Sequence, residues 1–240
     1  MNRSSQANTP TDVATYFGAD HAAIYDRRIR QRCPSYEALH AMLASWLSSI
    51  PGDARVLSAG AGTGAEILTL GQRFPDWQFV AADISSDMLD ACRQRLAAAG
   101  MVDRVAFHHG PLQGFRAAEP FNAATSILVS HFILDPTERL AYYRAIADRL
   151  RPGGTFILAD LFGAPGTPEF SLLFEAWLAS FAAQGMSAED LATERAHFQR
   201  DIAFLPEEEL LAMLETAGFS CPVRFYQTWL FGGWVMTKEL

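Results

Sequence analysis

The sequence predicts an α/β fold, a doubly wound and mostly parallel sheet of seven strands with an antiparallel C-terminal edge. Three observations support this prediction. Short apolar segments alternate with helical patterns over residues 55–160. A glycine-rich turn follows the first of these segments. Two further apolar segments, 223–228 and 230–237, are joined too closely for a crossover helix, so they must be antiparallel to each other.

Composition limits the class of protein. The chain has 240 residues, half of them hydrophobic, which allows one large domain with a substantial core. A net charge of -8 and the lack of a basic stripe argue against a nucleic-acid partner. Lys238 is the only lysine, which excludes Schiff-base chemistry and a Walker-type phosphate site. The three cysteines are far apart, which suggests neither a disulfide framework nor a zinc site.

The N-terminal region reads as a helical cap over residues 1–50. Residues 1–12 form a polar tail without an apolar signal core, and no apolar run is long enough to cross a membrane. We therefore expect a cytoplasmic protein with no membrane partner. Residues 13–50 have helical patterning, interrupted at Pro34.

The expected core covers residues 51–162. Its strands are expected at Arg55–Ala59, Gln78–Ala82, Arg104–His108, Ala123–Val129 and Thr155–Asp160. Its helices are expected at Glu66–Phe74, Ser86–Ala99 and Pro136–Leu150, the last ended by the turn at 151–154. The fourth strand has no interior charge, as a strand covered on both faces requires.

The alternation stops after residue 162. Residues 163–205 read as a helical lid insertion, in which Phe170, Phe174, Trp177 and Phe181 recur at helical spacing. Core packing is the favoured interpretation of this aromatic stripe, and a substrate wall is the alternative. Residues 206–240 then supply a helix, Pro206–Ala217, and the C-terminal hairpin that completes the sheet.

The glycine-rich turn is the most informative segment. It reads Ser58-Ala-Gly-Ala-Gly-Thr-Gly-Ala65 and opens a helix. Glycines allow a sharp turn and close approach of a ligand, and a helix N-terminus attracts a negative group. Asp83 ends the next strand, where a carboxylate suits a ribose diol. The alternatives are a turn that merely joins strand to helix, and an Asp83 that only caps the following helix.

A dinucleotide is the competing ligand, because Gly60, Gly62 and Ala65 also satisfy the looser dinucleotide pattern. A dehydrogenase usually needs a second substrate domain, for which the chain has no room. A short-chain dehydrogenase would need a lysine four residues after a tyrosine, and neither Tyr142 nor Tyr143 has one. The surrounding chain thus argues against a dinucleotide.

The sequence resembles the class I S-adenosylmethionine-dependent methyltransferases, which have a Rossmann-like fold. The resemblance covers about residues 50–162 and 206–240. Its motifs follow in family order at Val56–Gly64, Ala81–Met88, His109–Leu112, Ser126–Phe132 and Leu150–Gly154. The N-terminal segment 25–36 is similar to the cap of small-molecule methyltransferases and of the carboxy-S-adenosylmethionine synthase branch.

The resemblance implies S-adenosyl-L-methionine as cofactor and assigns residues to it. The glycines would line its methionine and ribose portion, Asp83 would hold the ribose hydroxyls and Ile84 would pack on the adenine. Arg32 of the cap, ahead of Arg27 and Arg28, would bind the cofactor carboxylate. The implied cofactor-binding set is Tyr16, Arg32, Ser58, Gly60, Gly62, Gly64, Asp83, Ile84, Met88, Gly110, Pro111, Leu112, Ser126 and Ile127.

Two positions depart from the family pattern. Ser58 stands where many members have an acid that helps to hold the cofactor ammonium, and a serine brings no charge. Pro111 follows Gly110 where an acid usually accepts a hydrogen bond from the adenine amino group. The Leu112 N–H could still reach the ring, and Gln113 could replace the missing acceptor.

Three side chains are candidates for the chemistry. His131 follows the fourth strand and is the candidate general base, with a buried packing histidine as the equal alternative. Asp160 could orient a polar substrate group or simply cap the strand end. Tyr25 in the cap would reach the same edge of the sheet. No cluster has metal-ligand spacing, and the adjacent His108 and His109 would point to opposite faces of a strand.

The leading hypothesis is a small-molecule methyltransferase of general or secondary metabolism, acting on an oxygen or nitrogen nucleophile. A second is an enzyme that consumes S-adenosylmethionine without methyl transfer, by cyclising its aminobutyryl arm or by carboxylating its methyl group. A third is a cofactor-binding regulator without catalysis. The sequence indicates neither the acceptor nor the oligomeric state.

Overall fold

The computed structural model describes residues 13–50 and 52–240, and the predicted polar tail at 1–12 lies outside the described residues. A single seven-stranded sheet has the order β3-β2-β1-β4-β5-β7-β6. Its strands are β1 (Arg55–Ala59), β2 (Gln78–Asp83), β3 (Val105–His109), β4 (Phe121–Ile127), β5 (Leu150–Leu161), β6 (Phe219–Thr228) and β7 (Phe231–Lys238). This confirms the predicted fold class.

The direction of the strands creates the crevice where a ligand can bind. Strands β3, β2, β1, β4 and β5 run parallel, whereas β7 is antiparallel to both β5 and β6. The chain order reverses between the neighbours β1 and β4. In open α/β sheets the carboxyl ends of the strands at such a reversal flank the ligand site.

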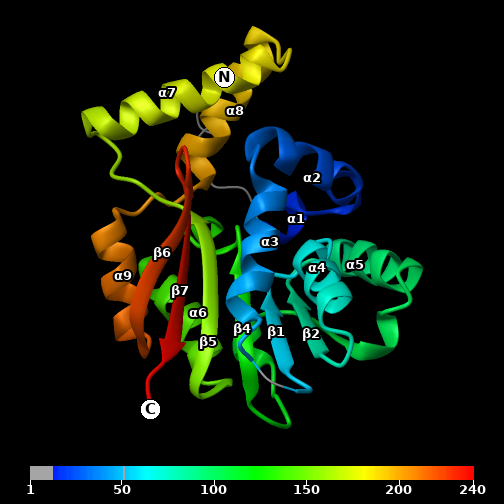
Figure 1. The fold of residues 1–240 in the computed structure, drawn as a ribbon. Coiled ribbons are helices and arrows are strands. Elements are labelled where there is room, and N and C mark those ends of the chain that lie inside the picture. Colours follow the sequence, from blue (N-terminus) through cyan, green and yellow to red (C-terminus); the bar gives the residue numbers. More distant parts are fainter. Residues whose placement is uncertain (1–12, 51) are drawn as a thin grey trace, which may run out of the picture.

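Helices cover both faces of the sheet (Figure 1). They are α1 (Val13–Tyr16), α2 (Ala19–Arg32), α3 (Tyr36–Leu47), α4 (Ala65–Arg73), α5 (Ser86–Ala98), α6 (Pro136–Ala147), α7 (Pro168–Ala183), α8 (Ala188–Asp201) and α9 (Glu207–Thr216), with short 3-10 turns η1 (Val102–Arg104), η2 (Leu112–Gly114) and η3 (Ser130–Phe132). The neighbours Val56 and Leu57 of β1 belong to different core clusters, because successive strand side chains point to opposite faces. The Val56 cluster includes α3, α4 and α5, and the Leu57 cluster includes α6 and α9.

Local signals explain where the helices flanking the crevice begin. The Ser85 hydroxyl accepts the Met88 N–H at 3.1 Å and so caps α5. Asp135 caps α6 through the N–H groups of Thr137 and Glu138, and Pro136 occupies the first turn. These caps fix the two helices on either side of the strand ends that hold the site.

The cap and the insertion lie together over the carboxyl ends of the strands. Figure 1 shows α7 and α8 beyond the end of the sheet, with α1 and α2 beside them. The Trp177 indole N–H donates to the Arg32 carbonyl at 2.7 Å and so joins α7 to α2. Of the aromatic stripe, Phe174, Trp177 and Phe181 are buried, which confirms the interpretation as core packing.

The start of β5 differs from the prediction. The turn expected at 151–154 lies within the strand, because β5 begins at Leu150 and α6 has already ended at Ala147. The pairing shifts from Phe121↔Leu150 to Ala123↔Thr155, so the intervening residues form a bulge. Gly153, with a φ of 69°, lets the backbone bulge without leaving the sheet.

Candidate cofactor and active site

A cavity of about 740 Å³ opens at the carboxyl ends of β1, β2 and β4. A volume of this size suits a nucleoside-sized ligand. Phe17 of the cap, and Val129 and Tyr142 beyond β4, help to close it. Its lining includes these predicted residues: Tyr25, Gly60, Gly62, Asp83, Ile84, Met88, Gly110, Pro111, Leu112 and Ile127.

The three glycines of the loop are required for different reasons. All have a positive φ, 74° at Gly60, 50° at Gly62 and 78° at Gly64. A Cβ at Gly60 would lie 2.4 Å from a methyl of Val129, and a Cβ at Gly64 would lie 2.5 Å from the Cys92 sulfur. Nothing lies within 4 Å of a Cβ at Gly62. Gly62 therefore faces open space in the cavity, whereas Gly60 and Gly64 allow close packing of the loop.

Asp83 joins the loop to the second strand. Its Oδ2 accepts the Gly62 N–H at 2.8 Å, and its Oδ1 accepts the Ser85 N–H at 2.9 Å. Burial raises the pKa of Asp83 above its ordinary value, although these N–H groups oppose that shift. A carboxylate oxygen can accept more than one bond, so Asp83 can also receive a hydroxyl from the cavity.

Part of the cavity wall is apolar. Ile84, which is 41% exposed, lines the cavity, and so does the loop that contains Gly110, Pro111 and Leu112. The Gly110 N–H donates to the Asp83 carbonyl at 2.9 Å, which places this loop beside the tip of β2. Gln113 also lines the cavity, where its amide can supply the acceptor that Pro111 lacks.

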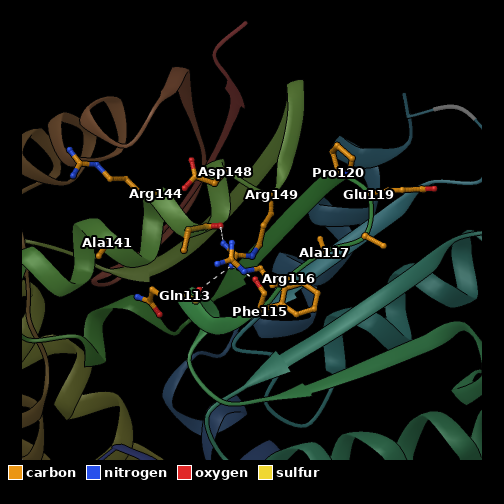
Figure 2. A pocket seen from close by; sticks show the side chains of 12 residues that line it. Gln113, Phe115, Arg116, Ala117, Glu119, Pro120, Ala141, Arg144, Asp148 and Arg149 are labelled. Atoms are coloured by element: carbon orange, nitrogen blue, oxygen red, sulfur yellow. Dashed lines mark hydrogen bonds between the residues drawn. The ribbon is translucent and has the colours of Figure 1, made fainter.

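A second hollow of about 480 Å³ adjoins the first at Gln113 and Ala141 (Figure 2). Figure 2 shows Arg149 in the middle of this second hollow, hydrogen-bonded to neighbouring residues. The Arg149 guanidinium donates to the carbonyls of Ala145, at 2.5 Å, and of Phe115. This arginine thus fastens the loop after β3 to the end of α6, which is a structural role.

Several predicted residues lie beneath the cavity rather than in its wall. The Ser58 hydroxyl donates to the Glu66 carboxylate, and both side chains are buried. Ser126 and Tyr142 share a hydrogen bond of 2.8 Å, and the Tyr142 hydroxyl donates to the Ala59 carbonyl at 3.1 Å. These bonds hold the tips of β1 and β4 in place. Sequence reasoning missed Glu66 and Tyr142.

His131 and Asp160 meet near the carboxyl ends of β4 and β5. The His131 Nδ1 is hydrogen-bonded to Asp160, whose other oxygen accepts the Arg139 Nη2–H at 2.7 Å and the Ser130 hydroxyl. Asp160 is 0% exposed. Burial alone would raise the pKa of Asp160, but the charges of His131 and Arg139 lower it below its ordinary value. Asp160 thus faces the Nδ1 edge of the His131 imidazole.

A small cavity of about 30 Å³ lies against His131. Phe17, Tyr25, Leu128 and Phe132 line both this space and the large cavity, so the two adjoin. The small cavity is closed on its other sides by the insertion and the cap, through Arg32, Trp177, His197 and Phe198. Asp160 lines neither space, so it contacts His131 and not a ligand.

The cap residues Arg32 and Tyr16 lie outside the lining of the large cavity. The Arg32 Nη2 is 2.6 Å from Glu194 Oε2 of α8, and Arg28 reaches the same carboxylate at 2.9 Å. The Tyr16 hydroxyl is 3.4 Å from His197 Nε2, and the two rings are stacked. Their expected cofactor contacts stay predictions. No feature of the sequence indicated that Glu194 would contact the cap, because it lies in a distant segment.

In the part of the chain that the structure describes, His, Cys, Asp and Glu side chains form no group of three that could hold a metal ion. No helix among these residues is long and apolar enough to span a membrane.

Residues 56–154, which carry the glycine loop, Asp83 and His131, match the family model described as a methyltransferase domain. Over these residues, which make up less than half of the chain, the protein is similar to a methyltransferase domain. Its cofactor is S-adenosylmethionine. The open face of Gly62, the free acceptor capacity of Asp83 and the apolar walls at Ile84 and Leu112 fit this molecule.

The proteins to which this chain is similar have different activities. The carboxy-S-adenosyl-L-methionine synthase of Methylococcus capsulatus is 26% identical over 227 residues, covering 92% of this chain and 93% of that protein. The tRNA1(Val) (adenine(37)-N6)-methyltransferase of Vibrio campbellii is 35% identical over 80 residues, only 33% of each chain. The structure of the Synechocystis magnesium protoporphyrin IX methyltransferase with bound SAH has a TM-score of 0.67 at 16% identity, covering 95% of this chain and 98% of that one. The last match shows a shared fold.

Proposed function

We propose that the protein transfers a methyl group from S-adenosylmethionine to an oxygen or nitrogen atom of a small molecule. The observation that carries the proposal is the buried His131–Asp160 pair beside a space that adjoins the cofactor cavity. Methyl transfer is an in-line displacement, so the enzyme must orient the acceptor, exclude water and often remove a proton.

His131 is the general base of this proposal, and Asp160 is a positioning residue. Asp160 holds the imidazole with its Nδ1 inward, so that Nε2 can take a proton from the acceptor. Tyr25 lines both cavities, and burial raises its pKa above its ordinary value. A phenol that stays protonated can donate a hydrogen bond to the acceptor or the cofactor and can close the reaction space to water.

The size and charge of the site favour a small acceptor. The space beside His131 is enclosed by aromatic side chains of the cap and the insertion, such as Phe17 and Trp177. The overall charge of -8 disfavours a nucleic-acid acceptor, and the similarity to a tRNA methyltransferase spans only 80 residues. The magnesium protoporphyrin IX methyltransferase, which shares the fold, acts on a small molecule.

A replacement of His131 tests the proposal. With an acceptor that must lose a proton, His131→Asn should lower kcat about 100- to 10,000-fold and leave cofactor affinity unchanged. Methylation of a tertiary amine or thioether, which has no proton to lose, should change much less. The matched control is His108→Asn, because His108 is a half-buried histidine that lines neither cavity. Equal losses with both kinds of acceptor would contradict the assignment of a base.

One observation favours a second candidate, an enzyme that consumes S-adenosylmethionine without methyl transfer. The similarity to carboxy-S-adenosyl-L-methionine synthase extends over nearly the whole chain, cap and insertion included. The space beside His131, about 30 Å³, is also small for an organic acceptor. A carboxylated cofactor, or methylthioadenosine released by cyclisation of the aminobutyryl arm, would be the product.

Mass spectrometry of the products separates these candidates. The protein is incubated with S-adenosylmethionine alone, and then with a panel of small phenols, amines and carboxylic acids. Methyl transfer predicts S-adenosylhomocysteine only when an acceptor is present. Methylthioadenosine without any acceptor supports cyclisation, and a cofactor heavier by one carboxylate supports the activity for which the synthase relatives are named. No product under any condition supports a cofactor-binding regulator.

A further inference from the structure

The second hollow, beside the loop that follows β3, contains a group of arginines without ion-pair partners. It has a volume of about 480 Å³, and Arg116, Arg144 and Arg149 line it. None of these three makes an ion pair with an acid among residues 13–50 and 52–240. The chain as a whole has a net charge of -8, so the sign of this cluster is opposite to that of the protein.

Arg149 stands in the middle of the hollow, and no ion pair in the described part of the chain neutralises it. Its guanidinium donates to the backbone carbonyls of Ala145 and Phe115, which are uncharged. Burial lowers the pKa of Arg149, the charge of Asp148 opposes this shift, and the charge of Arg116 adds to it. An arginine stays protonated in proteins, so the hollow keeps a positive charge at its centre.

Two acids also line the hollow, but neither forms an ion pair with its arginines. Glu119 instead pairs with Arg55, whose Nη1 lies 3.3 Å from the Glu119 Oε2. Asp148 is exposed, and it is a single carboxylate beside three guanidinium groups. The hollow therefore has an excess of positive charge, which a bound anion can compensate.

Arg116 and Arg144 are the arginines of the hollow that a ligand can reach most easily. Both are exposed, whereas Arg149 is half-buried and bonded to the last turn of α6. Figure 2 shows Arg116 beside Arg149 and Arg144 on the α6 side of the hollow. The other lining residues are largely apolar, among them Phe115, Ala117, Ala118 and Pro120. The volume leaves room for an organic group against these residues.

We propose that the second hollow binds a phosphate group, either as inorganic phosphate or as part of a small organic phosphate. Arg116 and Arg144 contact the phosphate oxygens, and the charge of Arg149 adds to the attraction from behind. A phosphate monoester has about -1.5 to -2 charges at pH 7, which suits more than one arginine. The planar guanidinium group also matches the spacing of phosphate oxygens.

The phosphate site is separate from the positions assigned to the cofactor and to the acceptor. The hollow shares Gln113 and Ala141 with the cofactor cavity, but its three arginines line only the hollow. His131, the proposed base, lines neither of these two spaces. A phosphate and the cofactor can therefore be bound at the same time.

Calorimetric titration with phenyl phosphate, with and without saturating S-adenosylhomocysteine, tests the inference. The wild-type protein should bind phenyl phosphate saturably in both conditions. Arg116→Gln and Arg144→Gln should each weaken this binding about 5- to 30-fold. Both side chains are exposed, so neither variant should unfold the protein. Arg151→Gln is the matched control, because it removes the same charge from an exposed arginine that does not line the hollow.

Two further ligands identify the source of the phosphate. Phenol, which has no phosphate, should not bind in the hollow. Inorganic phosphate that binds as tightly as phenyl phosphate would indicate a site for the free ion, whereas tighter binding of phenyl phosphate would indicate an organic phosphate. The inference is wrong if neither phosphate binds, if S-adenosylhomocysteine displaces phenyl phosphate, or if Arg151→Gln weakens binding as much as Arg116→Gln does.

Discussion

Asp83 and Asp160 stand at equivalent places in the sheet but serve opposite purposes. Each lies at the carboxyl end of a parallel strand, β2 and β5, at the edge where the ligand site lies. Asp83 is half-buried, accepts hydrogen bonds from the backbone N–H groups of Gly62 and Ser85, and lines the large cavity. Asp160 is sealed from both cavities by charged and polar side chains, among them Arg139 and His131.

The difference shows that a strand tip alone does not decide the role of an acid. The partners of Asp83 come from the backbone of two adjacent loops, so they leave its outer lone pairs free for a ligand. The partners of Asp160 include side chains of η3 and α6 besides the backbone N–H groups of His131 and Leu161, and the charged side chain of Arg139 uses its charge within the protein. In the proposed mechanism, the acid on the cofactor side binds the ligand, whereas the acid on the acceptor side orients His131.

The largest expected effect is the loss of stability when Asp160 is replaced. Asp160→Asn leaves Arg139 buried without its counter-charge, so the free energy of unfolding should fall by about 3–5 kcal/mol. Asp83→Asn removes an acid whose partners are backbone N–H groups and should cost clearly less. Urea unfolding of both variants measures the difference. Similar losses would contradict the distinction between the two acids.

Acid unfolding sharpens the same comparison. The folded pKa of Asp160 is lowered, so its contribution to stability is present above about pH 4 and is lost as the pH falls through the folded pKa. The folded pKa of Asp83 is raised, so its effect has the opposite sign. Its contribution to the free energy of unfolding decreases as the pH rises through the folded pKa. Between pH 3 and 7, the free energy of unfolding should therefore change less with pH in Asp160→Asn than in the wild-type protein.

The next largest effect concerns cofactor binding. Asp83→Ala removes the acid that faces the cavity and releases the Gly62 N–H, so affinity for S-adenosylhomocysteine should fall about 30- to 1,000-fold. Asp87→Ala, an exposed acid in the first turn of α5, is the matched control and should bind normally. Unchanged affinity in Asp83→Ala, measured by calorimetry, would show that the ribose assignment is wrong.

The smallest expected effect lies between the cap and the insertion. Glu194 joins α8 to Arg28 and Arg32 of α2, and these pairs are partly exposed. Glu194→Gln should weaken this contact by about 1 kcal/mol, so amide hydrogen exchange in α8 should become roughly fivefold faster. Glu189→Gln, an exposed acid in the same helix, should not change it. Unaltered exchange in Glu194→Gln would show that the ion pairs do not hold the insertion closed.

Most of the residues expected at the cofactor line the large cavity, and their signals in the sequence are local. Gly60, Gly62 and Asp83 act through backbone conformation and through bonds between neighbouring strand ends, which spacing along the chain reveals. The apolar wall at Ile84 and Leu112 follows directly from the same two loops. The parallel direction of the first five strands was likewise accessible from the alternation of apolar segments and helices.

The partners of the predicted residues His131, Asp160 and Arg32 escaped prediction because they come from distant segments. Arg139 of α6 meets Asp160 of β5, and Glu194 meets Arg32 across most of the chain. One weak signal was present in the sequence. Glu66 is a charge beside apolar positions of its helix, a pattern that indicates a buried partner or a ligand. The sequence was misleading at the bulge in β5, because a Pro-Gly-Gly segment normally ends a helix or strand, whereas here it lies within one.

The most direct test of the central claim is a competition between S-adenosylhomocysteine and NADH for the wild-type protein. We propose that the large cavity, with Gly62 and Asp83 in its wall, binds the adenosyl sulfonium cofactor. Calorimetric titration with S-adenosylhomocysteine should give saturable binding at one site per chain, and NADH should neither bind nor compete. Saturable binding of NADH, with no heat from S-adenosylhomocysteine, would contradict the account.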